Sequence, residues 1–267
     1  MENIAVIAAI TLVAAGIAYI LGGPRTALRR TRRTSIAAIS AGVAASVAVC
    51  GIEALVGEDS ELIDKTVAEA RTLPLVGLIL DDVPDAEKRL RTSLREELRN
   101  PTTQGPPRPL LLMAELRSTH IVPALRATDV AEARAVLDTR IALMRHLRGA
   151  DVALCRELAL VGLHQPDKLD PAGQKLMRDM LASMEKAYRA GRLALQRGAA
   201  PSSPSDAEAA TLLSEAGLTA DDFDRLRNLA RQSADEACDL GIKLNEASRN
   251  LPAHKAALLA RHLAAAQ

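Results

Sequence analysis

The N-terminal part of the chain contains an apolar run, residues 3–23, in which no side chain is charged. An α-helix of about 20 apolar residues, rising about 1.5 Å per residue, spans the ~30 Å hydrocarbon core of a bilayer. A secretory signal peptide needs a basic segment before a shorter apolar run, whereas only Met1 and Glu2 precede this one. We therefore expect a transmembrane helix over residues 3–23. The alternative is the buried helix of a globular domain.

A second apolar run, residues 36–57, follows a loop at residues 24–35 and is interrupted by one charge, Glu53. The loop carries five arginines, Arg25, Arg29, Arg30, Arg32 and Arg33. Basic loops remain on the cytoplasmic side of a membrane and can contact anionic lipids there. We therefore expect residues 1–57 to form a transmembrane helical hairpin with the rest of the chain outside. The alternative is a single crossing, with residues 36–57 as a packed helix and a cytoplasmic C-terminal part.

Glu53 shares one face of the second predicted helix with small residues, among them Gly42 and Ser46. One interpretation is a polar or proton-linked pathway across the membrane. The other is close contact between the two helices, for which small residues are the usual means. We favour close contact, because a single acid near the membrane interface needs no further role.

Downstream of residue 58 the patterning is typical of helices, and no alternating apolar and polar run is long enough for a strand. The sequence therefore predicts an all-α protein, in which the hairpin is followed by an elongated antiparallel helical bundle. Residues 58–109 are expected to form membrane-proximal helices that end in a proline-rich linker at 100–109, and residues 110–267 the bundle. The apolar run 73–80 is too short to cross a membrane, and we expect it to be an interfacial or docking segment.

Capping residues, prolines and glycines divide this part of the chain. Asp129 with Glu132, Ser205 with Glu208, and Thr219 each occur where a helix is expected to begin. The predicted helices are 60–72, 84–99, 110–127 with a kink at Pro123, 130–148, 151–164, 171–197, 206–216, 219–250 and one beginning at Pro252.

The strongest periodic pattern lies within residues 223–251, where small and apolar residues alternate at spacings of three and four. This spacing is typical of a coiled-coil-like packing seam. We call these residues the 223–251 seam, and its members are Phe223, Leu226, Ala230, Ser233, Ala237, Leu240, Leu244, Ala247 and Leu251. Helix 171–197 is a candidate partner, because it carries a stripe that we interpret as core rather than as a binding face. The members of the stripe are Met177, Met180 or Leu181, Met184, Tyr188, Gly191 and Leu195.

The part of the chain after the hairpin contains two cysteines, Cys155 and Cys238, on separate predicted helices. Disulfides persist in oxidising compartments and are rare in the cytosol. If the bundle lies outside the cytoplasm, this pair is a candidate disulfide. The alternative is two separate buried thiols. Cys155 belongs to a segment, 152–163, that is apolar on nearly all sides and is expected to lie at the centre of the bundle.

Patterns typical of catalytic and metal-binding sites are absent from the sequence. It has no glycine-rich phosphate loop, no Gly-x-Ser-x-Gly, no His-Glu-x-x-His, no Cys-x-x-Cys and no Glu-x-x-His. Its five histidines are not spaced as helical pairs. We therefore predict no catalytic residue, no cofactor and no metal site.

The charge balance, 34 basic against 33 acidic residues, leaves the part outside the arginine loop slightly acidic, and only 1% of the residues are aromatic. We expect no nucleic-acid partner on these grounds. The leading interpretation is a non-catalytic protein of the bacterial inner membrane. Its extracytoplasmic bundle would bind protein partners of unknown identity, or further copies of the chain, in an envelope assembly. Alternatives are a membrane-bound regulator or sensor with a cytoplasmic domain, an oligomeric pore or transport subunit, and an enzyme.

Overall fold

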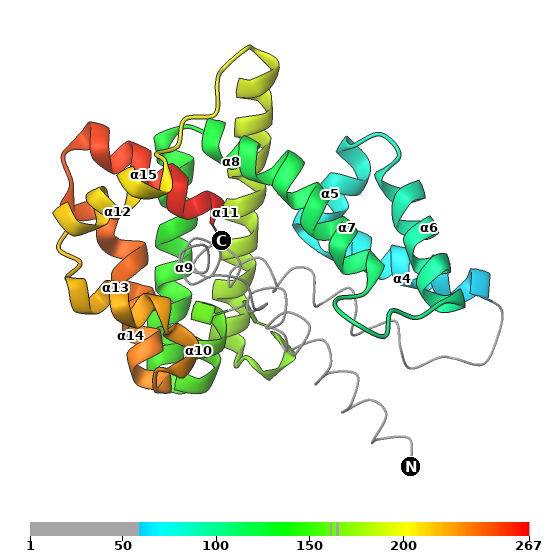
Figure 1. Cartoon of the computed structure of the whole chain (residues 1–267), viewed down its shortest axis with the longest axis horizontal. Coiled ribbons are helices and arrows are strands. Elements are labelled where there is room, and N and C mark those ends of the chain that lie inside the picture. Colours follow the sequence, from blue (N-terminus) through cyan, green and yellow to red (C-terminus); the bar gives the residue numbers. More distant parts are fainter. Residues whose placement is uncertain (1–58, 161, 164–165, 267) are drawn as a thin grey trace. The chain divides into compact units, whose positions relative to one another are not determined.

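The computed structural model describes residues 59–160, 162, 163 and 166–266, and all regular secondary structure in these residues is helical (Figure 1). The all-α prediction is confirmed for this part of the chain. No helix within it is both long enough and apolar enough to span a bilayer. The predicted hairpin, residues 1–57, lies outside the described residues, as do Arg25, Arg29, Arg30, Arg32, Arg33 and Glu53.

The described residues divide into two compact units, which we call unit 1 (residues 59–119) and unit 2 (residues 120–266). The sequence placed a boundary at residue 110, after the proline-rich segment, whereas contacts divide the described residues between residues 119 and 120. Helix α7 (Arg108–Leu116), which follows the segment, packs on α6 (Ala86–Arg99) and therefore belongs to unit 1.

Unit 1 consists of α4 (Asp59–Thr72), α5 (Pro74–Asp82), α6 and α7. The apolar run at 73–80 forms most of α5, and α5 packs on both α4 and α6. Its side chains Leu75, Val76 and Ile79 are buried, together with Leu90 of α6. This run is therefore part of the core of unit 1.

The proline-rich segment is a turn that a single carboxylate holds in place. Glu97 of α6 accepts hydrogen bonds from the Thr102 hydroxyl at 2.8 Å and from the Arg108 amide at 2.9 Å, and it also accepts from the Thr102 amide. These bonds bring the start of α7 back beside the end of α6. The segment therefore connects two packed helices of one unit rather than two domains.

The helix predicted over 110–127 is interrupted where the sequence placed a kink. A π-helical turn, η1 (Arg117–Ile121), separates α7 from α8 (Val122–Ala127), and Pro123 lies in the first turn of α8. Proline has no amide proton to donate to the preceding turn, and a π turn is a common way of accommodating such a break. The division between the two units falls within η1.

Unit 2 is built around α9 (Val130–Ala150), which contacts α10 (Val152–Leu160), α11 (Pro171–Gln196), α14 (Ala234–Glu246) and α15 (Ala253–Ala265). Figure 1 shows α9 between α14 and α11. Its buried side chains include Val136, Ile141 and Met144. The sequence placed residues 152–163 at the centre of the bundle, but α9 has that position and α10 packs on α9 and α14.

The centre of the stripe predicted on α11 is part of the core, since Met180, Met184, Tyr188 and Gly191 are buried, whereas Met177, Leu181 and Leu195 are partly exposed. The stripe packs on α9 and α8. At Gly191, helices α11 and α8 approach so closely that an added Cβ would overlap the carbonyl oxygen of Ala124 in α8. Glycine at this position allows the contact, because it has no side chain.

The single helix predicted over 219–250 is broken, and that prediction was wrong. The structure has α13 (Ala220–Arg227), the 3₁₀ turn η3 (Leu229–Arg231), α14 and the 3₁₀ turn η4 (Ala247–Asn250) in its place. The break occurs where Ser233 accepts a hydrogen bond from the Glu236 amide and Glu236 accepts one from the Ser233 amide. This capping box starts a new helix inside the heptad pattern.

The 223–251 seam is accordingly not one surface. Ala237, Leu240, Ala247 and Leu251 are buried, whereas Phe223, Leu226 and Leu244 are partly exposed and Ala230 is exposed. Ala237 and Leu240 belong to α14, which packs mainly on α10 and α9 rather than on the expected partner α11, whereas Ala247 belongs to η4, which packs on α15 and α14. Helix α12 (Asp206–Glu215) follows α11 and precedes α13 in the sequence, and it packs on α15.

Candidate functional site

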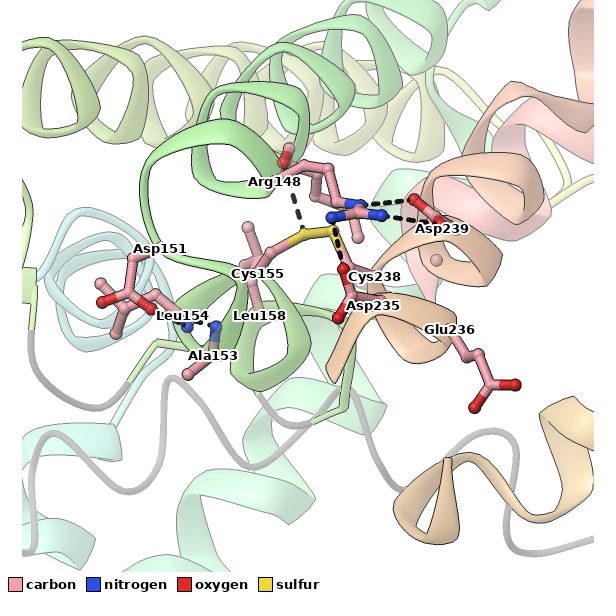
Figure 2. The surroundings of a disulfide bond; sticks show 12 residues. Arg148, Asp151, Ala153, Leu154, Cys155, Leu158, Asp235, Glu236, Cys238 and Asp239 are labelled. Carbon is pink, nitrogen blue, oxygen red and sulfur yellow. Dashed lines mark hydrogen bonds and ion pairs between the residues drawn. A yellow bond between two sulfur atoms is a disulfide. The ribbon is translucent and has the colours of Figure 1, made fainter. Parts of the chain in front are cut away.

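The site with the most specific chemistry in the described residues is a disulfide bond between Cys155 of α10 and Cys238 of α14 (Figure 2). The two Cα atoms are 5.3 Å apart, within the range that disulfides require, and the residues are 83 positions apart in sequence. Both cysteines are buried, each 0% exposed. The bond therefore links two helices in the interior of unit 2.

Each cysteine is positioned by a capped helix start. Asp151 accepts hydrogen bonds from the amides of Ala153 and Leu154, at 3.0 and 3.1 Å, at the beginning of α10. The capping box of Ser233 has the same role at the beginning of α14, shortly before Cys238. Both helix starts are encoded locally by an acid or a serine, and together they fix the turns that carry the two sulfur atoms.

An arginine of α9 binds α14 on both sides of Cys238 (Figure 2). The Arg148 guanidinium pairs with Asp235 at 2.6 Å and with Asp239 at 2.7 Å. Hydrogen bonding to Asp239 raises the pKa of Arg148 above its ordinary value. Because this cluster is on the surface, it adds little stability of its own, but it does hold α14 in register with α9.

A second arginine is buried inside the unit. Arg140 of α9 donates a hydrogen bond of 2.7 Å to the backbone oxygen of Leu158, near the end of α10. Burial lowers the pKa of Arg140 to about 10, so the group remains protonated at neutral pH. A cation is favourable at the C-terminal end of a helix, where unpaired carbonyl groups accumulate. Arg140 therefore holds the far end of the helix that carries Cys155.

Two further contacts keep α10 and α14 close. An added Cβ at Gly241 of α14 would lie 2.5 Å from Met144 Cε and 2.9 Å from Ala159 Cβ. Arg156 of α10 donates a 2.8 Å hydrogen bond to the backbone oxygen of Ala230 in η3. The disulfide thus lies in an interface that is closely packed at Gly241 and bridged by a hydrogen bond from Arg156.

Two of the described histidines, His146 and His262, have different hydrogen-bond partners. His146 lies 2.8 Å from Asp170, the N-cap of α11, and His262 of α15 lies 3.1 Å from the Ser203 hydroxyl. Burial and the nearby Arg126 lower the pKa of His262. Within the described residues no group of three or more His, Cys, Asp or Glu side chains could hold a metal ion.

The carboxylates whose pKa is shifted are helix caps or helix-linking groups. Asp222 is an example, since the Lys243 ammonium, at 2.6 Å, and the Thr219 amide lower its pKa to about 2. Asp170, Glu97, Glu208 and Glu236 are shifted in the same downward direction. General acid catalysis at neutral pH requires a carboxyl pKa raised toward 7. These groups are ionised and have structural partners.

Of the residues singled out in the sequence, the structure brings Cys155 and Cys238 together and divides the 223–251 seam. Sequence reasoning did not identify Arg140 as a buried group or the pairing of Arg148 with α14, because both depend on contacts between helices. A signal for Arg140 was present. It lies between Leu137 and Ile141 on the apolar face of its helix, where a charge needs a buried partner.

The fold and the site define a class of protein: in the described residues, two helical units, one of them closed by an internal disulfide. No family model matches the chain, and no curated protein or solved structure is significantly similar to it.

Proposed function

We propose that this chain is a non-catalytic, membrane-anchored protein of the bacterial envelope whose helical units bind protein partners outside the cytoplasm. The observation that carries the proposal is the Cys155–Cys238 disulfide. Disulfides form and persist in oxidising compartments, whereas cytosolic thiols are kept reduced. A disulfide in the interior of unit 2 therefore supports an extracytoplasmic location.

The sequence supports the same orientation by independent reasoning. The five arginines between residues 24 and 35 favour a cytoplasmic loop, and two crossings then place residues 58–267 outside. The rival topology, with one crossing, would place both cysteines in a reducing compartment. The positive-inside pattern and the disulfide thus favour the same topology on different physical grounds.

A binding role is supported by how the ionisable side chains are used. The acids with shifted pKa lie at helix caps, as Glu208 and Glu236 do, or link two helices, as Asp222 does. Arginines likewise join helix to helix, for example Arg148 to Asp239 and Arg89 to Glu115. These bonds stabilise a scaffold with a fixed surface, which is what a protein partner requires.

The proposal is tested by topology and by partner capture in the native membrane. A fusion of an enzyme that is active only outside the cytoplasm, placed after Gln267, should be active, and a fluorophore that matures only inside should be dark. The reverse pattern would contradict the extracytoplasmic location. Cross-linking in intact cells, followed by isolation in a mild detergent and mass spectrometry, should give a reproducible partner or a homo-oligomer. Recovery of an uncross-linked monomer alone would contradict the binding role.

A further inference from the structure

The disulfide lies where no other thiol can reach it. Both cysteine side chains are 0% exposed, and Cys155 Sγ is 3.3 Å from the backbone oxygen of Met144 in α9. Gly241 brings α14 against Met144 and Ala159 on the same face. An oxidant therefore has to reach the two buried thiols before this bond can form.

Disulfide formation by a protein oxidant proceeds through a mixed disulfide. A cysteine thiolate, having lost its proton to solvent, attacks the disulfide of the oxidant and expels one of its sulfurs as a thiolate. The thiolate of the second cysteine of this chain then attacks the first cysteine's sulfur in the mixed disulfide and expels the oxidant's remaining sulfur as a thiolate. The chain loses two electrons and two protons, and the disulfide of the oxidant becomes a dithiol. The first step requires that a sulfur of the oxidant contact Cys155 or Cys238 directly.

That contact cannot occur while α14 is docked on α9 and α10. The Arg148 guanidinium is paired with both Asp235 and Asp239, which lie on either side of Cys238 in α14. Arg156 bridges the neighbouring turn through the oxygen of Ala230. Separating α14, together with η3, from α9 and α10 removes these contacts and opens the interface in which both sulfur atoms lie.

We propose that unit 2 is a substrate of an extracytoplasmic thiol–disulfide oxidoreductase in a form with α14 undocked, and that docking of α14 then protects the disulfide from reduction. The modification site is the pair Cys155 and Cys238, and the co-reactant is a disulfide-bonded oxidant protein. The assignment of the oxidant to that compartment rests on the proposed function. The protection itself depends only on the packing of unit 2.

The test uses the purified full-length protein in detergent, with the disulfide formed. Dithiothreitol is added with or without denaturant, samples are quenched by alkylation over time, and the labels on Cys155 and Cys238 are counted by mass spectrometry. We expect native reduction to be at least about 100-fold slower than reduction of the unfolded chain, because the bond is reached only through opening. Native reduction within a factor of about two of the unfolded rate would overturn the proposal.

A pair of glycine variants separates opening of α14 from general loosening. Gly241→Ala places a methyl group against Met144 and Ala159 in the α14 interface, whereas Gly149→Ala adds one in open space near the end of α9. We expect Gly241→Ala to accelerate native reduction about 10-fold or more, because crowding the interface favours opening, and Gly149→Ala to leave it unchanged. Equal rates for the two variants would overturn the dependence on α14.

The two proposals fail in different ways. Free thiols in protein alkylated inside intact cells would contradict the extracytoplasmic location, and the oxidant with it. If the same protein, once oxidised with glutathione disulfide in denaturant and refolded, still resisted native reduction, the protection by α14 would stand. An oxidised cellular protein that dithiothreitol reduced without delay would contradict the protection alone.

Discussion

The helices within unit 1 and the helices within unit 2 are stabilised by different interactions. In unit 1 a network of side chains crosses three helices: Arg71 of α4 pairs with Asp81 of α5 and Glu87 of α6, and Arg91 of α6 pairs with Glu87 and Asp64. Unit 2 has ion pairs too, and both units have helices that approach closely at a glycine, Gly77 in unit 1 and Gly191 and Gly241 in unit 2. Within the described residues, the disulfide is what distinguishes unit 2, which therefore has a covalent constraint that unit 1 does not have.

The contrast indicates which conditions each unit tolerates. Exposed ion pairs contribute at most about 1 kcal/mol each and are screened by salt. Close packing and a disulfide are insensitive to salt, but a single substitution that removes or crowds them costs more. Hydrogen exchange in the intact protein can follow this difference, because peptides from the two units report separately.

Removal of the disulfide should have the largest effect. Replacing Cys155 and Cys238 together by alanine removes a cross-link between residues 83 positions apart, which in the loop-entropy model costs about 4.5 kcal/mol. We expect protection of α10 and α14 against hydrogen exchange to fall by that amount, with unit 1 unaffected. Equal protection in the wild type and the variant would show that packing alone holds α10 and α14 together.

The next effect should come from Gly191. A methyl group at this position overlaps the Ala124 carbonyl, a backbone atom that cannot rotate away, so Gly191→Ala should destabilise unit 2 by about 3 kcal/mol. Gly149→Ala is the matched control, since no atom lies within 4 Å of its added methyl group. Similar denaturation midpoints for the two variants would mean that α8 and α11 are not in close contact.

Much of the described fold was predictable because helix starts are encoded locally. Side chains cap the expected helices at Asp129, Asp170, Ser205 and Thr219, each accepting from an amide three residues later. The same rule would have found the start of α14 at Ser233, with Glu236 three residues on. The heptad pattern across residues 223–251 favours one continuous helix, and the predicted long helix was wrong because the cap at Ser233 starts a new helix within that pattern.

The features that the sequence did not reveal depend on contacts between distant residues. Nothing near Cys155 specifies that its helix lies beside α14, because that pairing follows from the way both helices pack around α9. Likewise, the proline-rich segment was interpreted as a domain linker because its hydrogen bonds to Glu97 are tertiary. Local patterns predict where elements begin and end, but they do not predict which elements pack together.

The ion-pair network of unit 1 should give a smaller, salt-dependent effect. Glu87→Gln removes the shared partner of Arg71 and Arg91, and we expect a loss of about 1 kcal/mol or less in low salt that disappears in high salt. Glu185→Gln is the control, because Glu185 pairs with Arg189 on its own helix and not across helices. A loss that persisted in high salt would mean that the network acts through packing.

The smallest effect should be a pH dependence confined to unit 2. Burial and Arg126 lower the pKa of His262, with Asp206 opposing the shift, and residues 59–119 contain no histidine. Because His262 binds a proton more readily in the unfolded chain, its neutral form in the folded protein contributes to stability. This contribution is complete above about pH 6.5 and is lost as pH falls toward the pKa of His262 in the folded protein. His262→Asn should reduce the acid sensitivity of unit 2 in that window. An unchanged pH profile would remove His262 as its source.

The claim that unit 2 is closed by a disulfide outside the cytoplasm is tested most directly by the state of its cysteines in the cell. Intact cells are treated with a membrane-permeant alkylating reagent before lysis, and the full-length chain is analysed by mass spectrometry without reduction. We predict a cross-linked peptide pair containing Cys155 and Cys238, with neither residue alkylated. Alkylation of both residues in the folded protein would contradict the disulfide and would remove the main support for the proposed location.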